Sequence, residues 1–175
     1  MRFRPTALPG VVVVEPERLA DARGFFARTF CAREFAAHGL PERFVQASLS
    51  FNPRRGTLRG MHFQEAGSGE GKLVRCTQGR IHDVALDLRR DSPAFRRHLS
   101  LELSAENRLA LYLPPGVAHG FLTLDKGCEV QYQMTEFFDP AAGRGVRFDD
   151  PAFGIVWPEA VEVVSDRDRT YPDFS

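Results

Sequence analysis

The sequence predicts an all-β fold in which many short strands form a sandwich or barrel, with one short helix near the N-terminus. From residue 44 to residue 135, runs of β-branched and apolar residues alternate with clusters rich in Gly, Asn, Asp and Pro. Their near-regular spacing is typical of strands joined by tight turns. No internal repeat or shift in composition interrupts the 175 residues, so we expect a single domain over residues 1–175.

Each expected element follows from a local pattern. Residues 11–14 are four valines, which favour a strand, and residues 25–30 are a second candidate strand after the turn-like segment 21–24. Residues 31–40 predict a short helix that stops near Gly39. Further strands are expected at 45–51, 57–63, 73–77, 80–88, 98–103, 110–113, 119–124 and 128–135, with turns at 104–107 and 125–127. Residues 160–164 predict a last strand, followed by a charged tail or a helical turn over 165–171.

The bulk composition excludes several classes of protein. Lys+Arg and Asp+Glu both number 23, and this balance argues against a nucleic-acid binder. No apolar run approaches the roughly 18 residues that span a bilayer, and the short valine run after a basic start makes a signal peptide a poor fit, so we expect no membrane partner. The three cysteines, Cys31, Cys76 and Cys128, are widely spaced, which indicates reduced thiols and a cytoplasmic location.

Two histidines and two cations stand among the expected strands. His62 and His119 each lie on or just before a strand, and Arg59 and Lys72 also stand among the apolar strands. Because Arg59 and His62 have opposite parity in an unbroken strand, Gly60 between them suggests a bulge that lets both face a pocket. Histidine transfers protons near neutral pH, so the pattern indicates a pocket for an anionic ligand and proton transfer.

Each of these residues also has a simpler interpretation. Alternation in 128–135 places Tyr132 on the apolar face of its strand, where it is either a core aromatic or a pocket residue. A strand histidine such as His62 is often a satisfied core residue, and Lys72 and Arg59 are of types that usually lie at the surface. Asp168 stands in the charged run 165–169, which is typical of a solvated segment. Residue types alone therefore leave the function open.

A metal site is the first alternative that the motifs raise. The segment Pro114-Pro-Gly-Val-Ala-His119 resembles the second cupin motif, and His62 with Gln64 stands where the first cupin motif has its ligands. An amide is a weak ligand for transition metals, and here it occupies the position of a second histidine. We therefore expect no catalytic metal.

A more specific resemblance covers residues 10 to 170. The motifs, in order, are similar to those of the dTDP-4-dehydrorhamnose 3,5-epimerase family: Asp21-x-Arg-Gly-Phe-Phe26, Gly56-x-Leu-Arg-Gly-x-His-Phe-Gln64, Gly71-Lys-Leu-Val-Arg75, Asp83-Val-Ala-Leu-Asp-Leu-Arg-Arg90, Ser92-Pro93, Leu103-Ser-Ala-Glu-Asn107, Pro114-Pro-Gly-x-Ala-His-Gly-Phe121, Gly145-x-Arg-x-Asp-Asp-Pro151 and Gly154-Ile-x-Trp-Pro158. The resemblance implies a cupin-type jelly-roll β-sandwich. It also implies a homodimer with N-terminal strand exchange.

The resemblance implies proton transfer on a nucleotide-linked 4-keto-6-deoxyhexose. The C4 ketone acidifies the protons on C3 and C5, a base removes one, and an acid returns a proton to the opposite face of the enolate. By resemblance His62 is the base, Asp168 orients it, Tyr132 is the acid and Lys72 stabilises the enolate oxygen, which is oxyanion-type stabilisation. No cofactor is implied, because the ketone supplies the acidity.

The resemblance also assigns substrate-binding positions, and here the chain departs from the family pattern. Ser48 ends a Gln-Asp-Asn stretch that reads Gln-Ala-Ser here, Arg28 and Gly143 stand in place of glutamates, Arg167 in place of a lysine, and Phe137 and Phe138 in place of tyrosines. We expect these changes to make the nucleotide end more basic and to alter the preferred base or sugar, or to restrict epimerisation to C3 or C5. The implied substrate-binding residues are Arg23 (from the partner subunit), Phe26, Arg28, Gln46, Ser48, Arg59, His119, Phe138 and Arg167.

Two other functions stay open at this stage. A sugar-nucleotide 3,4-ketoisomerase of the same fold uses similar enolisation chemistry, so product analysis is needed to separate it from an epimerase. A non-catalytic sugar-nucleotide binding protein would not need both a base and an acid. The function that we expect from the resemblance is an epimerase in deoxysugar biosynthesis.

Overall fold

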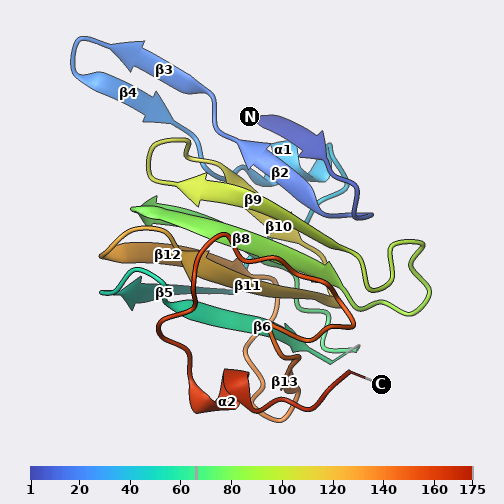
Figure 1. Ribbon diagram of the computed structural model, residues 1–175. Helices are drawn as coiled ribbons and strands as arrows, with labels where there is room; N and C mark the ends of the chain where they lie inside the picture. The colour runs from blue at the N-terminus through green and yellow to red at the C-terminus, as the bar shows by residue number, and fades with distance from the viewer. Residues whose placement is uncertain (66, 175) are drawn as a thin grey trace.

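The computed structural model describes residues 1–65 and 67–174, which form two antiparallel sheets (Figure 1). The first sheet has six strands in the order β1 (Arg2–Pro5), β2 (Val12–Glu15), β10 (Ala110–Leu113), β7 (Lys72–Gln78), β12 (Cys128–Met134) and β5 (Gln46–Asn52). The second has five strands in the order β13 (Gly143–Gly145), β6 (Leu58–Gln64), β11 (Val117–Thr123), β8 (Arg80–Asp87) and β9 (His98–Ser104). This arrangement confirms the all-β, cupin-type sandwich.

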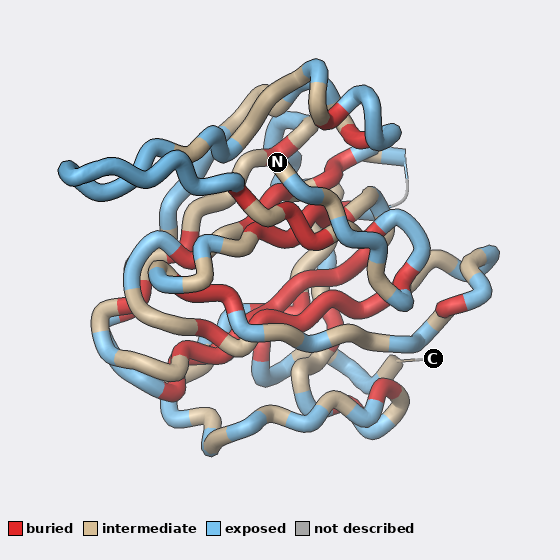
Figure 2. Tube along the Cα trace, turned by 90° about the horizontal axis from the view of Figure 1, so that it is seen from above, coloured by how far each residue is buried: buried red, intermediate tan, exposed pale blue. Residues whose placement is uncertain are grey.

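The main core lies between the two sheets. Val74 and Val130 from the first sheet meet Ile81, Ala85 and Phe121 from the second in one buried cluster. Each of them alternates along its strand with a residue of the opposite face, because side chains in a strand repeat every second residue. Figure 2 shows buried residues gathered in the middle of the molecule.

Two further clusters cover the outer faces of the sheets. The short helix α1 (Ala32–Ala36) places Phe35 against Val14 and Tyr112 on the outside of the first sheet. On the outside of the second sheet, Met61 and Val84 pack with Phe153 of the C-terminal segment. That segment includes α2 (Asp166–Arg169), which lies beside β6 (Figure 1). No helix among the described residues is long and apolar enough to cross a membrane.

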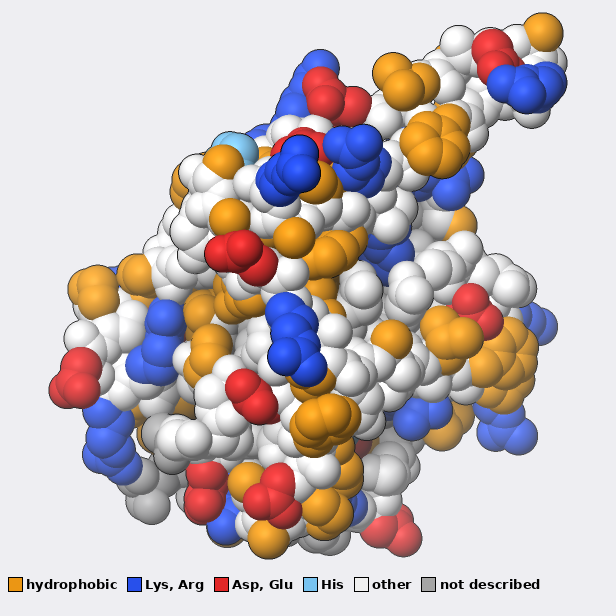
Figure 3. All heavy atoms as spheres, turned by 180° about the vertical axis from the view of Figure 1, so that it is seen from behind, with side chains coloured by type: hydrophobic (Ala, Val, Ile, Leu, Met, Phe, Trp, Pro, Cys, Tyr) orange, Lys and Arg blue, Asp and Glu red, His pale blue; other side chains and the backbone are white. Residues whose placement is uncertain are grey.

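A hairpin of β3 (Arg18–Asp21) and β4 (Gly24–Ala27) projects away from both sheets (Figures 1 and 3). We call residues 18–27 the arm. Its side chains include the exposed hydrophobic residues Leu19, Phe25 and Phe26. An apolar surface of this kind is typical of a segment that contacts another molecule.

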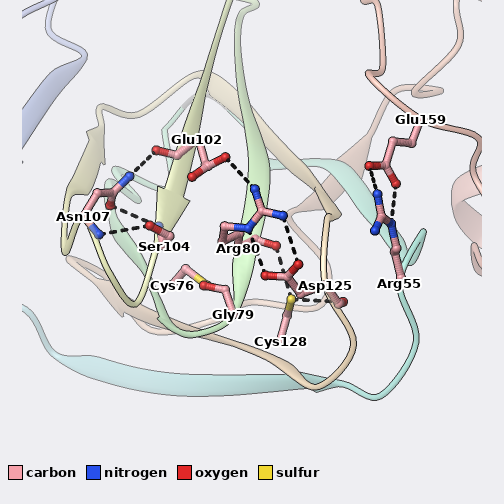
Figure 4. A network of polar contacts seen from close by, with 10 residues as sticks. All are labelled: Arg55, Cys76, Gly79, Arg80, Glu102, Ser104, Asn107, Asp125, Cys128 and Glu159. Carbon is pink, nitrogen blue, oxygen red and sulfur yellow. Dashed lines mark hydrogen bonds and ion pairs between the residues drawn. The ribbon is translucent and has the colours of Figure 1, made fainter.

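Polar contacts fix the turns at one end of the sandwich (Figure 4). The Asn107 side chain accepts hydrogen bonds from the amides of Ser104 and Leu109, at 3.1 and 3.0 Å. Arg80 pairs with Asp125 at 3.1 Å and with Glu102 at 3.3 Å. The turns expected at 104–107 and 125–127 are therefore confirmed.

The structure corrects three sequence-based predictions. The expected strand at 160–164 is wrong, since this segment makes only one isolated bridge, between Val163 and Thr57. The expected helix at 31–40 ends at Ala36, after which the chain turns through Gly39. The strand expected at 25–30 is the shorter β4, and its partner β3 was not predicted, nor were β1 and β13.

Candidate active site

A cavity of about 360 Å³ brings together residues from several strands and from the loop before β13. His62 on β6, Lys72 on β7 and Tyr132 on β12 border it together, although they are far apart in the sequence. Four of the expected substrate-binding residues also line it: Gln46, Ser48, Phe138 and Arg167. A larger hollow of about 710 Å³ is lined by Pro9, Phe63, Gly116 and residues 88–93, and collects no comparable set of titratable groups.

A bulge in β6 positions the histidine. His62 lies opposite His119 on β11, and Arg59 lies opposite Phe121. Between these two pairs β6 advances by three residues and β11 by two, which is a β-bulge. A side chain on Gly60 would overlap the backbone of β11, so glycine is required there. The bulge predicted at this glycine is confirmed, and it lets Arg59 and His62 border the same adjoining cavity of about 440 Å³.

Asp168 on α2 holds the ring of His62. Its Oδ1 lies 2.6 Å from Nε2 of His62, and its Oδ2 accepts a hydrogen bond from the Gly60 amide at 3.2 Å. The Ser165 hydroxyl caps α2 and accepts from the Asp168 amide at 3.1 Å. Because a carboxylate only accepts, neutral His62 carries its proton on Nε2 and keeps the lone pair on Nδ1. The aspartate side chain is 5% exposed and the histidine side chain 42%.

The pKa of Asp168 is below its ordinary value. Burial alone would raise this pKa, but hydrogen bonds from His62, from the Gly60 amide and from the capped first turn of α2 stabilise the ionised form and outweigh the burial. The carboxylate is therefore charged at neutral pH. A negative charge at this place stabilises an imidazolium, so the pair is arranged for a histidine that takes up a proton.

Tyr132 faces His62's cavity from the opposite sheet. Burial raises the pKa of its hydroxyl strongly, and a hydrogen bond with Ser50, at 3.4 Å, lowers it only in part. The hydroxyl therefore stays protonated at neutral pH, which is the state that a proton donor needs. His119 does not line the cavity as expected but packs edge-on against Tyr132, with ring centroids 6.1 Å apart, and Nε2 of His119 lies 2.7 Å from Oδ1 of the fully buried Asp83.

Glu70 is a cavity residue that the sequence analysis missed. Its carboxylate pairs with Lys72 at 2.9 Å and accepts a hydrogen bond from the Gln64 amide. The oxygen of Gln64 accepts from the Asp139 amide at 3.1 Å, so both ends of its side chain are engaged. Glu70 lies in the glycine-rich loop before β7 and outside any strand, so no periodic pattern in the sequence could have singled it out.

Arginines expected to bind substrate lie at three different places. Arg59 borders the adjoining cavity, and its Nε donates a hydrogen bond to Asn52 at 2.7 Å. This hydrogen bond does not use the two terminal nitrogens of the guanidinium. Arg23 lies at the tip of the arm, 90% exposed and bonded to Asp21. Arg28 pairs with Glu34 at 2.9 Å, outside the cavity, so its charge is offset within the chain.

The residues at the cupin-motif positions are engaged with neighbouring protein groups. His62 and His119 each use one ring nitrogen for an aspartate, and Gln64 uses its oxygen for a backbone amide. Among the residues that the structure describes, no group of three or more His, Cys, Asp or Glu side chains could hold a metal ion.

Comparison with known proteins gives consistent matches. The family model for dTDP-4-dehydrorhamnose 3,5-epimerase matches residues 5–175. The dTDP-4-dehydrorhamnose 3,5-epimerase of Methanothermobacter thermautotrophicus is 44% identical over 173 residues, which are 97% of this chain and 92% of that protein. A solved structure of dTDP-4-dehydrorhamnose 3,5-epimerase from Bacillus anthracis, with TDP and PPi bound, has a TM-score of 0.95 and 35% identity over 99% of both chains.

A relative of narrower specificity is also similar. The structure of a 3'-monoepimerase from Streptomyces bikiniensis, in complex with dTDP-quinovose, has a TM-score of 0.89 and 33% identity over 97% of this chain and 86% of that chain. Sequence motifs, fold and full-length matches agree. The chain belongs to the dTDP-4-dehydrorhamnose 3,5-epimerase family.

Proposed function

We propose that this protein is an epimerase of a nucleotide-linked 4-keto-6-deoxyhexose in deoxysugar biosynthesis, with His62 as the base and Tyr132 as the acid. One observation carries the proposal: both groups border a single cavity, and the buried Asp168 holds the histidine from behind. Membership in an isomerase family supports it. A protein that only binds sugar nucleotides has no need of a paired base and acid.

The proposed reaction uses groups whose protonation states suit their roles. Nδ1 of His62 takes the proton from the carbon beside the ketone, and the electrons of the C–H bond form an enolate with its charge on O4. The ammonium of Lys72 stabilises this charge. Tyr132 then donates its hydroxyl proton to the opposite face of the same carbon. Each turnover leaves an imidazolium and a tyrosinate, and proton exchange with solvent restores both.

The adjoining cavity suits the nucleotide diphosphate. Arg59 and Arg167 both line it, next to His62. Guanidinium groups bind phosphate oxygens through two parallel hydrogen bonds, so a pair of arginines matches a doubly charged diphosphate. Asn52 orients the first of them through its Nε. This arrangement supports a substrate whose sugar lies next to the catalytic base His62 and whose diphosphate lies toward Arg59 and Arg167.

We also propose that the active unit is a homodimer with exchanged N-terminal strands, located in the cytoplasm. The arm supports this part of the proposal, because it carries Arg23 and the 71% exposed Phe26 away from the chain's own cavity. An exposed aromatic and an exposed arginine on the same hairpin match a base and a phosphate. In a dimer the arm would complete the neighbouring cavity.

The test is an NMR experiment in D₂O with dTDP-4-keto-6-deoxyglucose. We expect deuterium to enter both C3 and C5 and the exchange to be lost in the His62→Ala variant. In Tyr132→Phe we expect exchange to persist while inverted product falls, since the base still removes the proton but the acid is absent. Absence of exchange with any nucleotide sugar would refute the proposed function.

Product analysis in the same samples separates the related reactions. Label at one carbon alone would show a single-site epimerase, and a 3-keto product would show a ketoisomerase. The nucleotide is tested by measuring the affinities for dTDP and CDP. A clear preference for dTDP would refute the expectation that the altered positions change the preferred base.

A further inference from the structure

Glu70 is the least exposed charged side chain that lines the cavity, and it does not belong to the proposed proton-transfer pair of His62 and Tyr132. The side chain of Glu70 is 3% exposed, whereas that of its partner Lys72 is 18% exposed. Burial of an unpaired carboxylate would cost several kcal/mol, and here Oε1 of Glu70 forms an ion pair with the Lys72 ammonium while Oε2 accepts a hydrogen bond from Gln64.

The geometry gives this ion pair a direction. The carboxylate is the recessed end and the ammonium is the end nearer to solvent, so the positive end of the pair is presented to the cavity. A lysine side chain has several freely rotating bonds and loses up to about 2 kcal/mol of entropy when it is fixed. Glu70 fixes the ammonium before substrate arrives. Stabilisation of a developing charge is strongest when the stabilising group needs no rearrangement.

The same carboxylate is linked to the loop over the cavity. Glu70 accepts from Gln64, and Gln64 accepts from the amide of Asp139, which follows the cavity residue Phe138. The Phe138 amide in turn donates to Gln46 at 2.9 Å. One buried carboxylate therefore contacts the lysine and, through a glutamine, the loop that lines the cavity.

We propose that Glu70 is a positioning residue for the reaction, which holds the ammonium of Lys72 toward the enolate oxygen and anchors the loop at 137–143 through Gln64. The inference rests on the proposed function for the identity of the developing charge. Glu70 acts through Lys72, so its removal should slow proton transfer much more than it weakens nucleotide binding.

A double-mutant cycle tests the inference by kinetics. We expect Glu70→Gln, which keeps size and removes charge, to lower kcat about 10- to 100-fold, while the Kd for dTDP changes by less than about twofold. In a Lys72→Met background the same substitution should add little further loss, because the two residues act as a unit. Glu102→Gln, which removes a surface carboxylate paired with Arg80, is the matched control.

Unchanged kcat in Glu70→Gln would overturn the proposal, and so would a loss that adds in full to that of Lys72→Met. A fall in melting temperature with unchanged kcat would show a purely structural role. Glu70→Asp is expected to restore part of the activity, since it returns the charge with a shorter reach.

A second measurement does not depend on turnover. The chain contains two lysines, Lys72 and the exposed Lys126, so the ammonium region of a ¹⁵N-labelled sample is simple to assign. We expect a sharp, slowly exchanging ammonium signal for Lys72 that broadens in Glu70→Gln, with Lys126 unchanged. An unaltered Lys72 signal would overturn the positioning role. Lack of activity in the wild type beside the expected signals would instead refute the proposed function alone.

Discussion

Replacement of Asp168 by asparagine tests the base more sharply than deletion of the histidine. The two carboxylate oxygens of Asp168 both accept hydrogen bonds, from Nε2 of His62 at 2.6 Å and from the Gly60 amide at 3.2 Å. Asparagine keeps the shape but has only one accepting oxygen. Either its amide group faces the histidine and forces the proton onto Nδ1, or it faces the Gly60 amide and places two donors together.

The first outcome removes the base and the second weakens it. In the first, Nδ1 carries a hydrogen and has no lone pair for the substrate; in the second, the ring loses the charge that stabilises the imidazolium. General-base catalysis by a positioned side chain contributes about 10²- to 10⁴-fold, and the loss of a histidine-orienting aspartate in a protease triad is known to reach about 10⁴-fold. We therefore expect kcat for Asp168→Asn to fall by about 10²- to 10⁴-fold, with KM changed little.

The assay is the rate of deuterium incorporation at C3 and C5, compared with overall turnover. Asp166→Asn is the matched control, because Asp166 lies on the same turn of α2 but is exposed. We expect that control to retain activity within about twofold, since surface substitutions usually have small effects. Equal losses in the two variants, or full activity in Asp168→Asn, would refute the reasoning.

Two predictions concern stability. A methyl group on Gly145 would overlap the ring of Tyr171, so we expect Gly145→Ala to lower the free energy of unfolding by about 1–3 kcal/mol. The melting temperature should fall by roughly 2–4 °C for each kcal/mol. Gly143→Ala is the control and should change little, because the nearest atom to its added methyl group would be 3.6 Å away. Because its folded pKa is lowered, Asp168 contributes stability that is complete above its unfolded pKa of about 4 and disappears as pH falls through the lower folded value. In urea unfolding, the free energies of unfolding of the wild type and of Asp168→Asn should therefore become more alike as the pH is lowered. A difference in free energy that does not change with pH would contradict the pKa argument.

The middle of the fold was predictable because its strands alternate in hydrophobicity. The interior place of Tyr132 and the bulge at Gly60 both follow from strand parity, which is a strong signal when one face is buried. The short strands β1, β3 and β13 contain charged residues or glycine and show no apolar run, whereas β2 and β10, which are no longer than four residues, are mostly apolar. Residues 160–164 have the composition of a strand, but Val163 alone makes a bridge, because sheet pairing depends on distant partners that local sequence does not reveal.

The candidate site divides in the same way. The contact between His62 and Asp168 joins residues 106 positions apart, and residue types alone left Asp168 as a solvated charge. Only the resemblance to a family singled it out. Glu70 escaped both approaches, since a glutamate in a glycine-rich loop resembles a surface residue until its burial against Lys72 is known. Arg28, which was expected at the nucleotide end, pairs with Glu34 within the chain, and its part in substrate binding stays a prediction.

The placement of the base shows why such a site needs the whole fold. His62 reaches the cavity because a bulge in β6 changes the parity of the strand, and the same bulge frees the Gly60 amide to donate to Asp168. The bulge in β6 thus sets the direction of His62 and also provides the Gly60 amide as a hydrogen-bond donor to Asp168. The partner itself arrives on the C-terminal segment, where the Ser165 cap fixes the first turn of α2. Strand and tail therefore depend on each other for the geometry of the base.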